Sequence, residues 1–547
     1  MRLFVVSNRV AVSTGQSAPG GMTVGIEGAL RAHGGVWVGW SGKASTDGSV
    51  SSRCVAHGNV DYVTLDLPPE KFQGYYAGFA NQVLWPLCHG RRDLVAYSSG
   101  DFESYLHVNG LFADELVRRL GPDDLIWIHD YHLVPLARAL RARGVGSRIG
   151  FFLHTPFADP DDLFDLPVHG AIAESLEAYD LLGFQTRGDL ESFRTFISRS
   201  RASRRLGSVH LTSPPRADVF PIGIETAEFE STARAAQIVD TRLSAIFDRL
   251  GSGIAAIISA DRLDYSKAIP EKFRAFGAFL ELHPEYEERV CLVQVAPIGR
   301  SEIPAYALEA ARTRSAYRDL RAAHQRAELP VAELLTESVD RPSLAAAFRR
   351  SRVGLVTPFR DGMNLVAKEY VAAQDADDPG VLVLSSFTGA AEELSGGALL
   401  VDPREALSVV RALRQALEMG IEERRARWSK MISVICRNDA AAWAGNFIES
   451  LRGRREAPHL RSTSIAPSRD APRARLDFRA VRTAQSSWEV QAVSDRARHL
   501  VVGRAAPGDG ARTAFVTNNA GVNEFLLRVR SAGYTTELLG PNGPVKL

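Results

Sequence analysis

Short apolar runs, each followed by a polar loop and a helical pattern, recur along both halves of the chain. Residues 3–7, 125–129, 254–259 and 353–356 are runs of this kind. Such runs are typical of parallel strands that are buried on both faces, with helices covering the sheet. The alternation predicts an α/β fold with two Rossmann-like domains that face each other across a cleft.

Composition limits the class of protein. A chain of 547 residues is too long for one core, so two domains and an additional segment are expected. An apolar content of 45% and a charged content of 24% are those of a soluble globular protein. The net charge of +1 gives no support for nucleic acid or an acidic membrane as a partner.

Cysteine usage and the start of the chain favour the cytoplasm. Cys54, Cys88, Cys291 and Cys436 lie far apart and lack the spacing of metal ligands. The first residues do not form a signal peptide, and no apolar run approaches the length of a membrane span. We therefore expect a cytoplasmic protein with reduced thiols.

The loop after residues 353–356 carries a dense group of candidate ligand-binding residues. Gly362 is expected at its bend, and the start of the next helix offers unpaired N–H groups and a positive dipole end to a diphosphate. Glu369 can accept hydrogen bonds from a vicinal diol such as a ribose, and Asp361 and Asn364 can bind sugar hydroxyls. An ordinary turn with solvated carboxylates is the alternative.

Polar residues also follow other predicted strands. Arg9 ends the first strand, and a glycine-rich loop then leads through Gly20 and Gly21 to a helix, which can admit a phosphate or a sugar close to the backbone. Asp130 and His154 fall at the carboxyl ends of two strands, where ligands of open α/β sheets gather. Taken singly, Arg9 could equally be a surface residue, Asp130 a cap and His154 a satisfied core histidine.

Two familiar ligand motifs are absent, and a third is misplaced. No GxGxxG follows the first strand, and GWSGK lacks the first glycine of a P-loop. Asp375-Ala376-Asp377 has the letters of a DxD metal site but lies in a polar turn after a helix, so we interpret it as solvated surface.

Arg262 and Lys267 flank a turn before a helix, where two fixed cations can neutralise a diphosphate leaving group without a metal. We therefore expect no metal and no other cofactor.

Aromatic residues are concentrated between residues 37 and 85. Such a concentration usually marks a core, but aromatic rings also stack on the C–H faces of sugars. The residues are Trp37, Trp40, Tyr75, Tyr76, Phe79 and Trp85.

The segment RDGMNLVAKEYVAAQ, residues 360–374, resembles the donor-site loop of glycosyltransferase family 20, the trehalose-6-phosphate synthases. The resemblance extends over residues 1 to about 450 and includes YYAGFANQVLWP and RLDYSK. It implies a GT-B fold and a retaining transfer of glucose from a nucleotide-glucose, UDP-glucose first among them, to glucose 6-phosphate. The product would be α,α-trehalose 6-phosphate. The two substrates would be the partners, and the implied assembly is a homo-oligomer, a dimer or a tetramer.

The resemblance also implies roles for individual residues. Catalytic roles fall to His154, Arg262, Lys267 and Asp361. The acceptor glucose 6-phosphate would be bound by Arg9, Trp40, Tyr76, Trp85, Asp130 and Arg300, with the two arginines on its phosphate. The donor nucleotide-glucose would be bound by Gly20, Gly21, Arg262, Lys267, Val339, Asp361, Gly362, Met363, Asn364, Leu365, Val366 and Glu369, with His154 at its hexose.

Two positions depart from the family pattern. Ala268 stands where glycine is usual. Val339 replaces a phenylalanine whose backbone contacts the nucleotide base, which leaves the preferred base open.

Two other functions are considered. One is a relative with another acceptor, such as a glucosylglycerol-phosphate synthase or a pseudo-glycosidic coupling enzyme. The other is a non-catalytic regulator that binds sugar phosphate. The complete set of acceptor residues favours the transfer to glucose 6-phosphate, and the retained Arg262, Lys267, Asp361 and Glu369 weigh against a regulator.

The same segments predict the domain organisation. Residues 1–228 are expected to form the acceptor-side domain, 229–435 the donor-side domain, and 436–453 a helix that crosses back to the first domain. Residues 454–510 are rich in arginine and poor in apolar residues, which is typical of a disordered linker. Residues 511–547 form a small tail segment without an assigned role, and they lack the DxDxT motif of a phosphatase.

Overall fold

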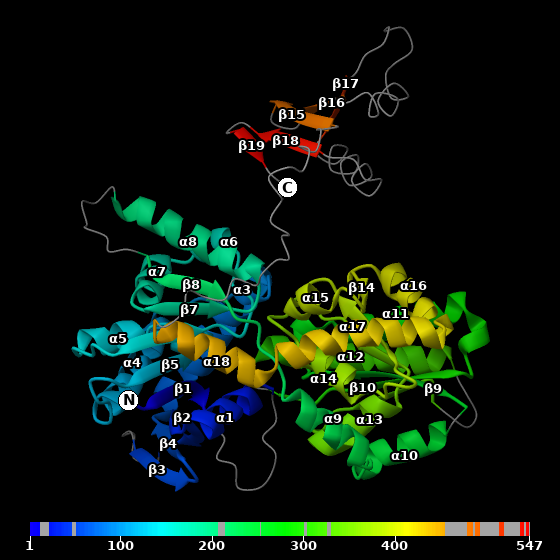
Figure 1. The fold of residues 1–547 in the computed structure, drawn as a ribbon, viewed down its shortest axis with the longest axis horizontal. Helices are drawn as coiled ribbons and strands as arrows, with labels where there is room; N and C mark the ends of the chain where they lie inside the picture. The colour runs from blue at the N-terminus through cyan, green and yellow to red at the C-terminus, as the bar shows by residue number, and fades with distance from the viewer. Residues whose placement is uncertain are drawn as a thin grey trace, which may run out of the picture. The chain divides into compact units, whose positions relative to one another are not determined.

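The computed structural model divides into two compact units, Met1–Pro458 and His459–Leu547 (Figure 1). In the first unit it describes residues 1–10, 21–45, 51–205, 214–251, 253–299, 303–324 and 330–453. In the second unit it describes residues 478–484, 487–492, 514–518, 536–540 and 543–545. No helix among these residues is long and apolar enough to cross a membrane.

The first half of the larger unit is built on an eight-stranded sheet with the order β3-β4-β2-β1-β5-β6-β7-β8. All neighbouring strands are parallel except β3 and β4. The central strands are continuous buried apolar runs, which is why the sheet is covered on both faces. The strands are β1 (Leu3–Arg9), β2 (Gly35–Ala44), β3 (Ser51–His57), β4 (Val60–Leu67), β5 (Leu125–His129), β6 (Arg148–Phe152), β7 (Leu181–Phe184) and β8 (Arg216–Val219).

The helices of this half include an unusual one. Residues Gln73–Leu84 form a π-helix, η1, which carries three of the clustered aromatic residues. π-helical segments are rare and are frequently found at functional sites. The other helices are α1 (Gly21–His33), α2 (Pro69–Phe72), α3 (Trp85–Cys88), η2 (Arg92–Leu94), α4 (Ser99–Val117), η3 (Tyr131–Leu133), α5 (Leu136–Ala142), α6 (Pro160–Phe164), α7 (His169–Glu177) and α8 (Arg187–Arg205).

The second half of the larger unit contains a six-stranded parallel sheet with the order β11-β10-β9-β12-β13-β14. Its strands are β9 (Ala255–Ala260), β10 (Val290–Val295), β11 (Ala332–Leu335), β12 (Val353–Val356), β13 (Val381–Ser385) and β14 (Leu399–Val401). Its helices are α9 (Thr226–Ala235), α10 (Thr241–Leu250), η4 (Tyr265–Lys267), α11 (Ile269–Leu282), η5 (Pro284–Tyr286), α12 (Pro304–Ala323), α13 (Arg341–Arg350), α14 (Leu365–Ala373), α15 (Gly389–Leu394), α16 (Ala406–Glu418) and α17 (Ile421–Arg437). Two separate, helix-covered sheets confirm the predicted α/β class.

The chain crosses between the halves twice. After α17 it returns to the first half as α18 (Ala440–Leu451), which lies along the first sheet in Figure 1. Phe447 stacks on Trp127 of β5 with ring centroids 4.7 Å apart. The first crossing precedes α9, which packs on α13 and α14 of the second half. The predicted boundary at 228 would cut α9, so the boundary is better placed before Thr226.

The two crossings touch each other. A Cβ atom on Gly223 would lie 2.1 Å from the carbonyl oxygen of Asn438, so no larger residue fits there. The buried ammonium of Lys368 donates to the carbonyl of Ile222 at 2.7 Å and pairs with Glu393. Glu393 also accepts a hydrogen bond from the Asn438 side chain at 2.7 Å. One side-chain network therefore holds both connections.

The second unit contains a five-stranded sheet with the order β17-β16-β15-β18-β19. Its strands are β15 (Phe478–Ala484), β16 (Ser487–Ala492), β17 (Ala514–Asn518), β18 (Thr536–Gly540) and β19 (Gly543–Val545). The prediction of a disordered linker over 454–510 is therefore wrong for β15 and β16, which pair in antiparallel register. Ala480 and Val490 face each other across this hairpin and are both buried, an alternation that the surrounding arginines obscure in the sequence.

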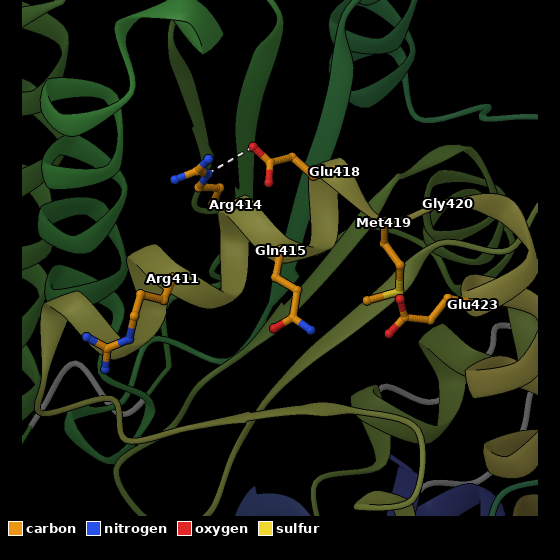
Figure 2. Close-up of a pocket in the computed structure, with 7 residues that line it drawn as sticks. All are labelled: Arg411, Arg414, Gln415, Glu418, Met419, Gly420 and Glu423. Atoms are coloured by element: carbon orange, nitrogen blue, oxygen red, sulfur yellow. Dashed lines mark hydrogen bonds and ion pairs between the residues drawn. The ribbon is translucent and has the colours of Figure 1, made fainter.

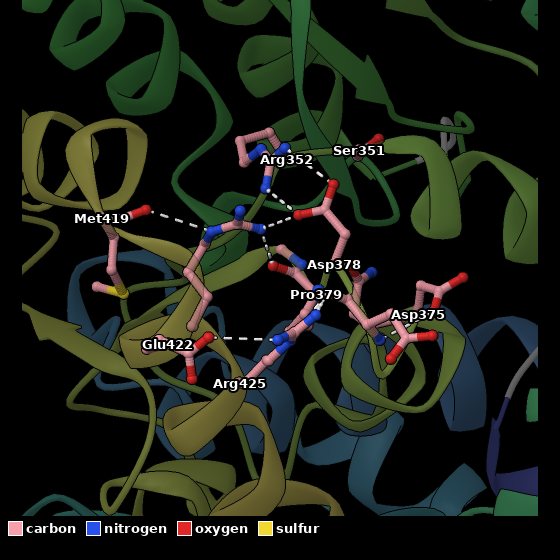
Figure 3. Close-up of polar contacts among 12 residues, drawn as sticks. Ser351, Arg352, Asp375, Asp378, Pro379, Met419, Glu422 and Arg425 are labelled. Atoms are coloured by element: carbon pink, nitrogen blue, oxygen red, sulfur yellow. Dashed lines mark hydrogen bonds and ion pairs between the residues drawn. The ribbon is translucent and has the colours of Figure 1, made fainter.

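The DxD letters of residues 375–377 belong to a turn between α14 and β13 that arginines hold (Figure 3). Asp375 pairs with Arg349. Asp378 accepts hydrogen bonds from Arg352 at 3.1 Å and from Arg424 at 2.5 Å. Arg424 also donates to the carbonyls of Pro379 and Met419, so this nearly buried side chain fixes the turn onto α17.

Replacing Arg424 with methionine should lower the stability of the larger unit. Methionine fills much of the space but leaves the buried Pro379 carbonyl without its donor, which costs about 1–3 kcal/mol. Urea-induced unfolding of the full chain measures the loss. Arg425→Met is the matched control, because the Arg425 side chain is 43% exposed and, among the described residues, binds the Asp377 carbonyl and Glu422. Equal losses in the two variants would contradict a structural role for Arg424.

Candidate functional site

The loop between β12 and α14 presents an anchored carboxylate. Asn364 caps α14 by accepting a hydrogen bond from the N–H of Ala367 at 3.3 Å. It also donates from its side chain to Asp361 Oδ2 at 3.0 Å. Asp361 Oδ1 accepts from the N–H of Gly362 at 3.0 Å. The Asp361 side chain is therefore oriented by its own loop before any ligand arrives.

Lys267, at the end of η4, forms an ion pair with Asp361. The two side chains keep only 12% and 16% of their surface exposed. Burial raises the pKa of Asp361, but the Lys267 ammonium outweighs it, and His89 and Asn364 help to hold this pKa below its usual value. The site therefore contains a fixed carboxylate and a fixed cation in direct contact.

Ala268 follows Lys267 in the left-handed conformation, with φ of 52° and ψ of 38°. This conformation explains why glycine is usual at the position in the resembling family, since a Cβ atom costs about 1–2 kcal/mol there. Ala268 is also fully buried, so packing holds it in this conformation. The backbone bend, rather than the side chain, is the feature that the site requires.

Gly362 is needed for a different reason from the one expected. Its φ is not positive, so the bend itself does not require glycine. A Cβ atom on Gly362 would instead lie 1.9 Å from the carbonyl oxygen of His154, in the other half of the unit. Arg360 adds a second link, because it donates to the carbonyl of Phe157 at 2.9 Å. The donor-side loop thus lies directly against the strand ends of the first sheet.

Asp130 and His154 follow neighbouring strands, as predicted, and they contact each other. Asp130 Oδ1 accepts a hydrogen bond from the backbone N–H of His154 at 3.3 Å. Asp130 has φ of 74° and ψ of 164°, a region that is nearly exclusive to glycine and costs about 1–3 kcal/mol. A strained residue of this kind is common at ligand sites, where packing holds a side chain in a required direction.

The aromatic residues form two groups beside these strand ends. Trp40 lies between Phe72, at 4.3 Å, and Arg9, whose guanidinium carbon is 5.7 Å from the indole centroid. Tyr76 stacks on Phe72 at 5.1 Å. Trp85 belongs to the second group, where the Arg262 guanidinium lies 5.7 Å from its ring.

Several residues of the site were not identified from the sequence. Phe72 was missed because it lies in a short helix among polar residues. His132 was missed too, and it stacks on Tyr76 with centroids 5.7 Å apart. The His89 ring lies tilted against Trp85, with centroids 4.1 Å apart, and burial lowers the pKa of His89 to about 4. His129 was read only as the last residue of an apolar strand, yet its ring contacts His154.

The remaining predicted donor residues lie on or beside α14 and α13. Burial raises the pKa of Glu369 to about 7, against the opposing effect of Arg341. Val339 precedes Asp340, the N-terminal cap of α13, and packs against the core. Met363 is buried, and Leu365 and Val366 are partly buried against the same core. Gly21 begins α1, whereas Gly20 and Arg300 lie outside the described residues.

A pocket of about 350 Å³ lies elsewhere, on α16 and α17 (Figure 2). Arg414 and Glu418 on its wall bind each other at 2.9 Å. The lining residues are Arg411, Arg414, Gln415, Glu418, Met419, Gly420 and Glu423, none of which is a predicted site residue. No group of three or more potential metal ligands occurs in the part of the chain that the structure describes.

Comparison with known proteins identifies a family for this chain. The model of glycosyltransferase family 20 matches residues 5–453. The trehalose-6-phosphate synthase of Klebsiella pneumoniae is 43% identical over 455 residues, which are 82% of this chain and 95% of the relative.

Solved structures agree in fold. An α,α-trehalose-phosphate synthase (UDP-forming) from Burkholderia xenovorans in complex with glucose-6-phosphate has a TM-score of 0.76 and 39% identity, covering 83% of this chain and 100% of its own. The E. coli protein bound with UDP-2-fluoro glucose has a TM-score of 0.76 and 41% identity, covering 83% and 99%. The predicted GT-B fold is thereby confirmed. With a match over residues 5–453 and relatives covered almost in full, this chain belongs to glycosyltransferase family 20.

Proposed function

We propose that this protein is a retaining glycosyltransferase that moves glucose from a nucleotide-glucose, with UDP-glucose the expected donor, to glucose 6-phosphate. The product is α,α-trehalose 6-phosphate. The observation that carries the proposal is the Lys267–Asp361 pair, set at the start of α14 and packed through Gly362 against His154. Relatives named trehalose-6-phosphate synthase, and solved structures with glucose-6-phosphate or UDP-2-fluoro glucose, support the choice of substrates.

The leaving group is a nucleoside diphosphate, and its growing charge requires positive groups that are already in place. Asp361 holds Lys267 at the strand end, so the ammonium needs little reorganisation when a phosphate replaces part of this contact. Arg262 is exposed and lies over Trp85, from where its long side chain can reach a phosphate. The N-terminus of α14 adds backbone N–H groups and the positive end of its dipole.

Neighbouring groups would bind the two sugars. Burial lowers the pKa of His154 to about 3, so its neutral ring acts as a hydrogen-bonding group toward the donor hexose, not as an acid. Glu369 would bind the ribose. On the acceptor side, Trp40 and Tyr76 offer ring faces, Asp130 accepts hydroxyl hydrogen bonds, and Arg9 stands beside Trp40 for the phosphate.

An assay of product formation distinguishes the candidate functions. A panel of nucleotide-glucoses is incubated with glucose 6-phosphate, glycerol 3-phosphate or no acceptor, and the products are identified by mass spectrometry and NMR. Trehalose 6-phosphate with an α,α linkage is the expected product. A different glycoside would show a relative with another acceptor, and tight binding without turnover would show a sugar-phosphate regulator. The family further suggests a homo-oligomer, and sedimentation of the purified chain tests this oligomeric state. It also suggests the cytoplasm, which fractionation of cells tests.

Lys267→Met should reduce kcat by about 10²–10³, because it removes one preorganised donor to the leaving group. Lys272→Met is not a suitable control, since its buried ammonium pairs with Asp261 inside the core. Lys430→Met, on the exposed face of α17, is the matched surface variant.

A chelator tests whether the reaction needs a metal: EDTA should leave the unaltered enzyme active. Abolition of turnover by EDTA, with the fold retained, would refute a metal-independent leaving-group site.

Arg9→Ala should chiefly raise the KM for glucose 6-phosphate. A charge-assisted hydrogen bond to phosphate is worth roughly 1.5–3 kcal/mol, or about 10- to 100-fold in apparent affinity. The KM for the nucleotide-glucose should change little. Arg53→Ala serves as control, because Arg53 lies on the exposed edge strand β3 and pairs with Asp66. An unchanged acceptor KM in Arg9→Ala would show that the phosphate binds elsewhere.

Removing every residue after Gly453 should leave kcat and both KM values unchanged. All residues assigned to the site lie at or before Glu369, and His459–Leu547 form a separate compact unit. Steady-state kinetics and thermal unfolding of the truncated chain provide the measurement. A large change in turnover or melting temperature would instead indicate that the tail regulates or supports the transferase unit.

A further inference from the structure

His129 and His154 form a hydrogen-bonded pair of buried imidazoles. His129 is the last residue of β5 and is fully buried, and His154 follows the adjacent strand β6. Nδ1 of His129 lies 3.0 Å from Nε2 of His154. The strands set this geometry, because His129 is in register with Phe152, two residues before His154.

The walls around the pair are aromatic. The His129 ring lies 4.5 Å from that of Trp127, and Trp443 of α18 lies 6.2 Å from His129 and 5.9 Å from His154. Phe152 meets the His154 ring edge-on at 4.7 Å. Burial in these surroundings lowers the pKa of both histidines, so both rings are neutral near pH 7.

A neutral imidazole carries one ring proton, so one histidine of the pair donates and the other accepts. Nε2 of His129 is buried and has no hydrogen-bond partner among the described residues. A proton at Nε2 would be a buried N–H group without an acceptor, which is rarer in proteins than an acceptor without a donor. The proton of His129 is therefore on Nδ1, and Nε2 of His154 accepts the hydrogen bond from this N–H group.

We infer that His129 is a positioning residue that donates a hydrogen bond to His154 and fixes it as the neutral tautomer with the proton on Nδ1. That N–H has no acceptor within the described part of the protein. It remains available as a directed donor to a ligand. The consequence for catalysis rests on the proposed function: the His154 Nδ1–H would donate to a hydroxyl oxygen of the donor hexose. His129 itself would touch neither substrate.

The tautomer can be measured directly in the full-length protein. Nitrogen-15 NMR of histidine-labelled enzyme separates protonated from unprotonated ring nitrogens, and His154→Asn identifies the His154 signals among those of the 13 histidines. A protonated Nδ1 and a bare Nε2 on His154 are expected in the free enzyme. A proton on Nε2, or a mixture of both tautomers, would overturn the inference. This measurement uses no substrate, so it stands even if the proposed reaction is wrong.

Kinetics of three variants test the positioning role. His129→Phe keeps a ring but removes the donor, and should lower kcat/KM for the nucleotide-glucose by about tenfold while the KM for glucose 6-phosphate stays unchanged. His129→Asn restores a donor near the same place and should recover most of the loss. Trp443→Phe alters the same aromatic wall without a hydrogen bond to either histidine, and should leave the His154 tautomer as it is.

The outcomes separate positioning from simple packing. Equal losses in His129→Phe and His129→Asn, or a loss below twofold in a folded His129→Phe variant, would overturn the role. A second His154 tautomer that appears in His129→Phe, but not in Trp443→Phe, supports it. If His129→Phe does not fold, the NMR measurement on the unaltered chain decides.

Discussion

The close approach of Gly362 to the carbonyl of His154 is the contact on which the site depends. It joins the carboxyl edges of the two sheets. A side chain at residue 362 would push the loop away and carry Asp361 with it. Asp361 also forms the ion pair with Lys267. The position of the Lys267 ammonium in the second half therefore depends on the backbone at His154 in the first half. Binding and chemistry at such a site require both halves to be in place.

The site also concentrates the backbone strain of the larger unit. Among the described residues, the non-glycine residues with positive φ are Asp130, Ala268 and Asn364. All three lie in the segments that follow strands β5, β9 and β12, and these segments carry the candidate ligand groups. Each conformation has an energetic cost that the surrounding packing must offset. The strained conformations direct polar groups of these segments to positions that an unstrained turn would not give. The fold therefore retains the strain at these residues.

The sequence predicted the architecture well, because buried parallel strands leave continuous apolar runs. It also placed Asp130 and His154 after strands and the 361–364 loop before a helix, as they are in the structure. It could not show that Gly362 is required by a contact with residues about two hundred positions earlier, since such contacts leave no local pattern. His129 was hidden because a histidine that ends an apolar strand looks like any core residue. Strands β15 and β16 were missed because arginines interrupt their short alternation.

The adjoining chain crossings at Gly223 and Asn438 limit how the two halves can move. Two connections that lie far apart would confine rotation to the line that joins them. Here the carbonyl of Asn438 lies against Gly223. Lys368 of α14 and Glu393 of α15 bind each other and contact the two connecting segments at Ile222 and Asn438. Such an arrangement holds the halves together at one place, so any rotation between them would take place about this place. Lys368 adjoins Glu369 on α14. A nucleotide bound by Glu369 would therefore lie close to the place about which the halves rotate, where a rotation displaces atoms least.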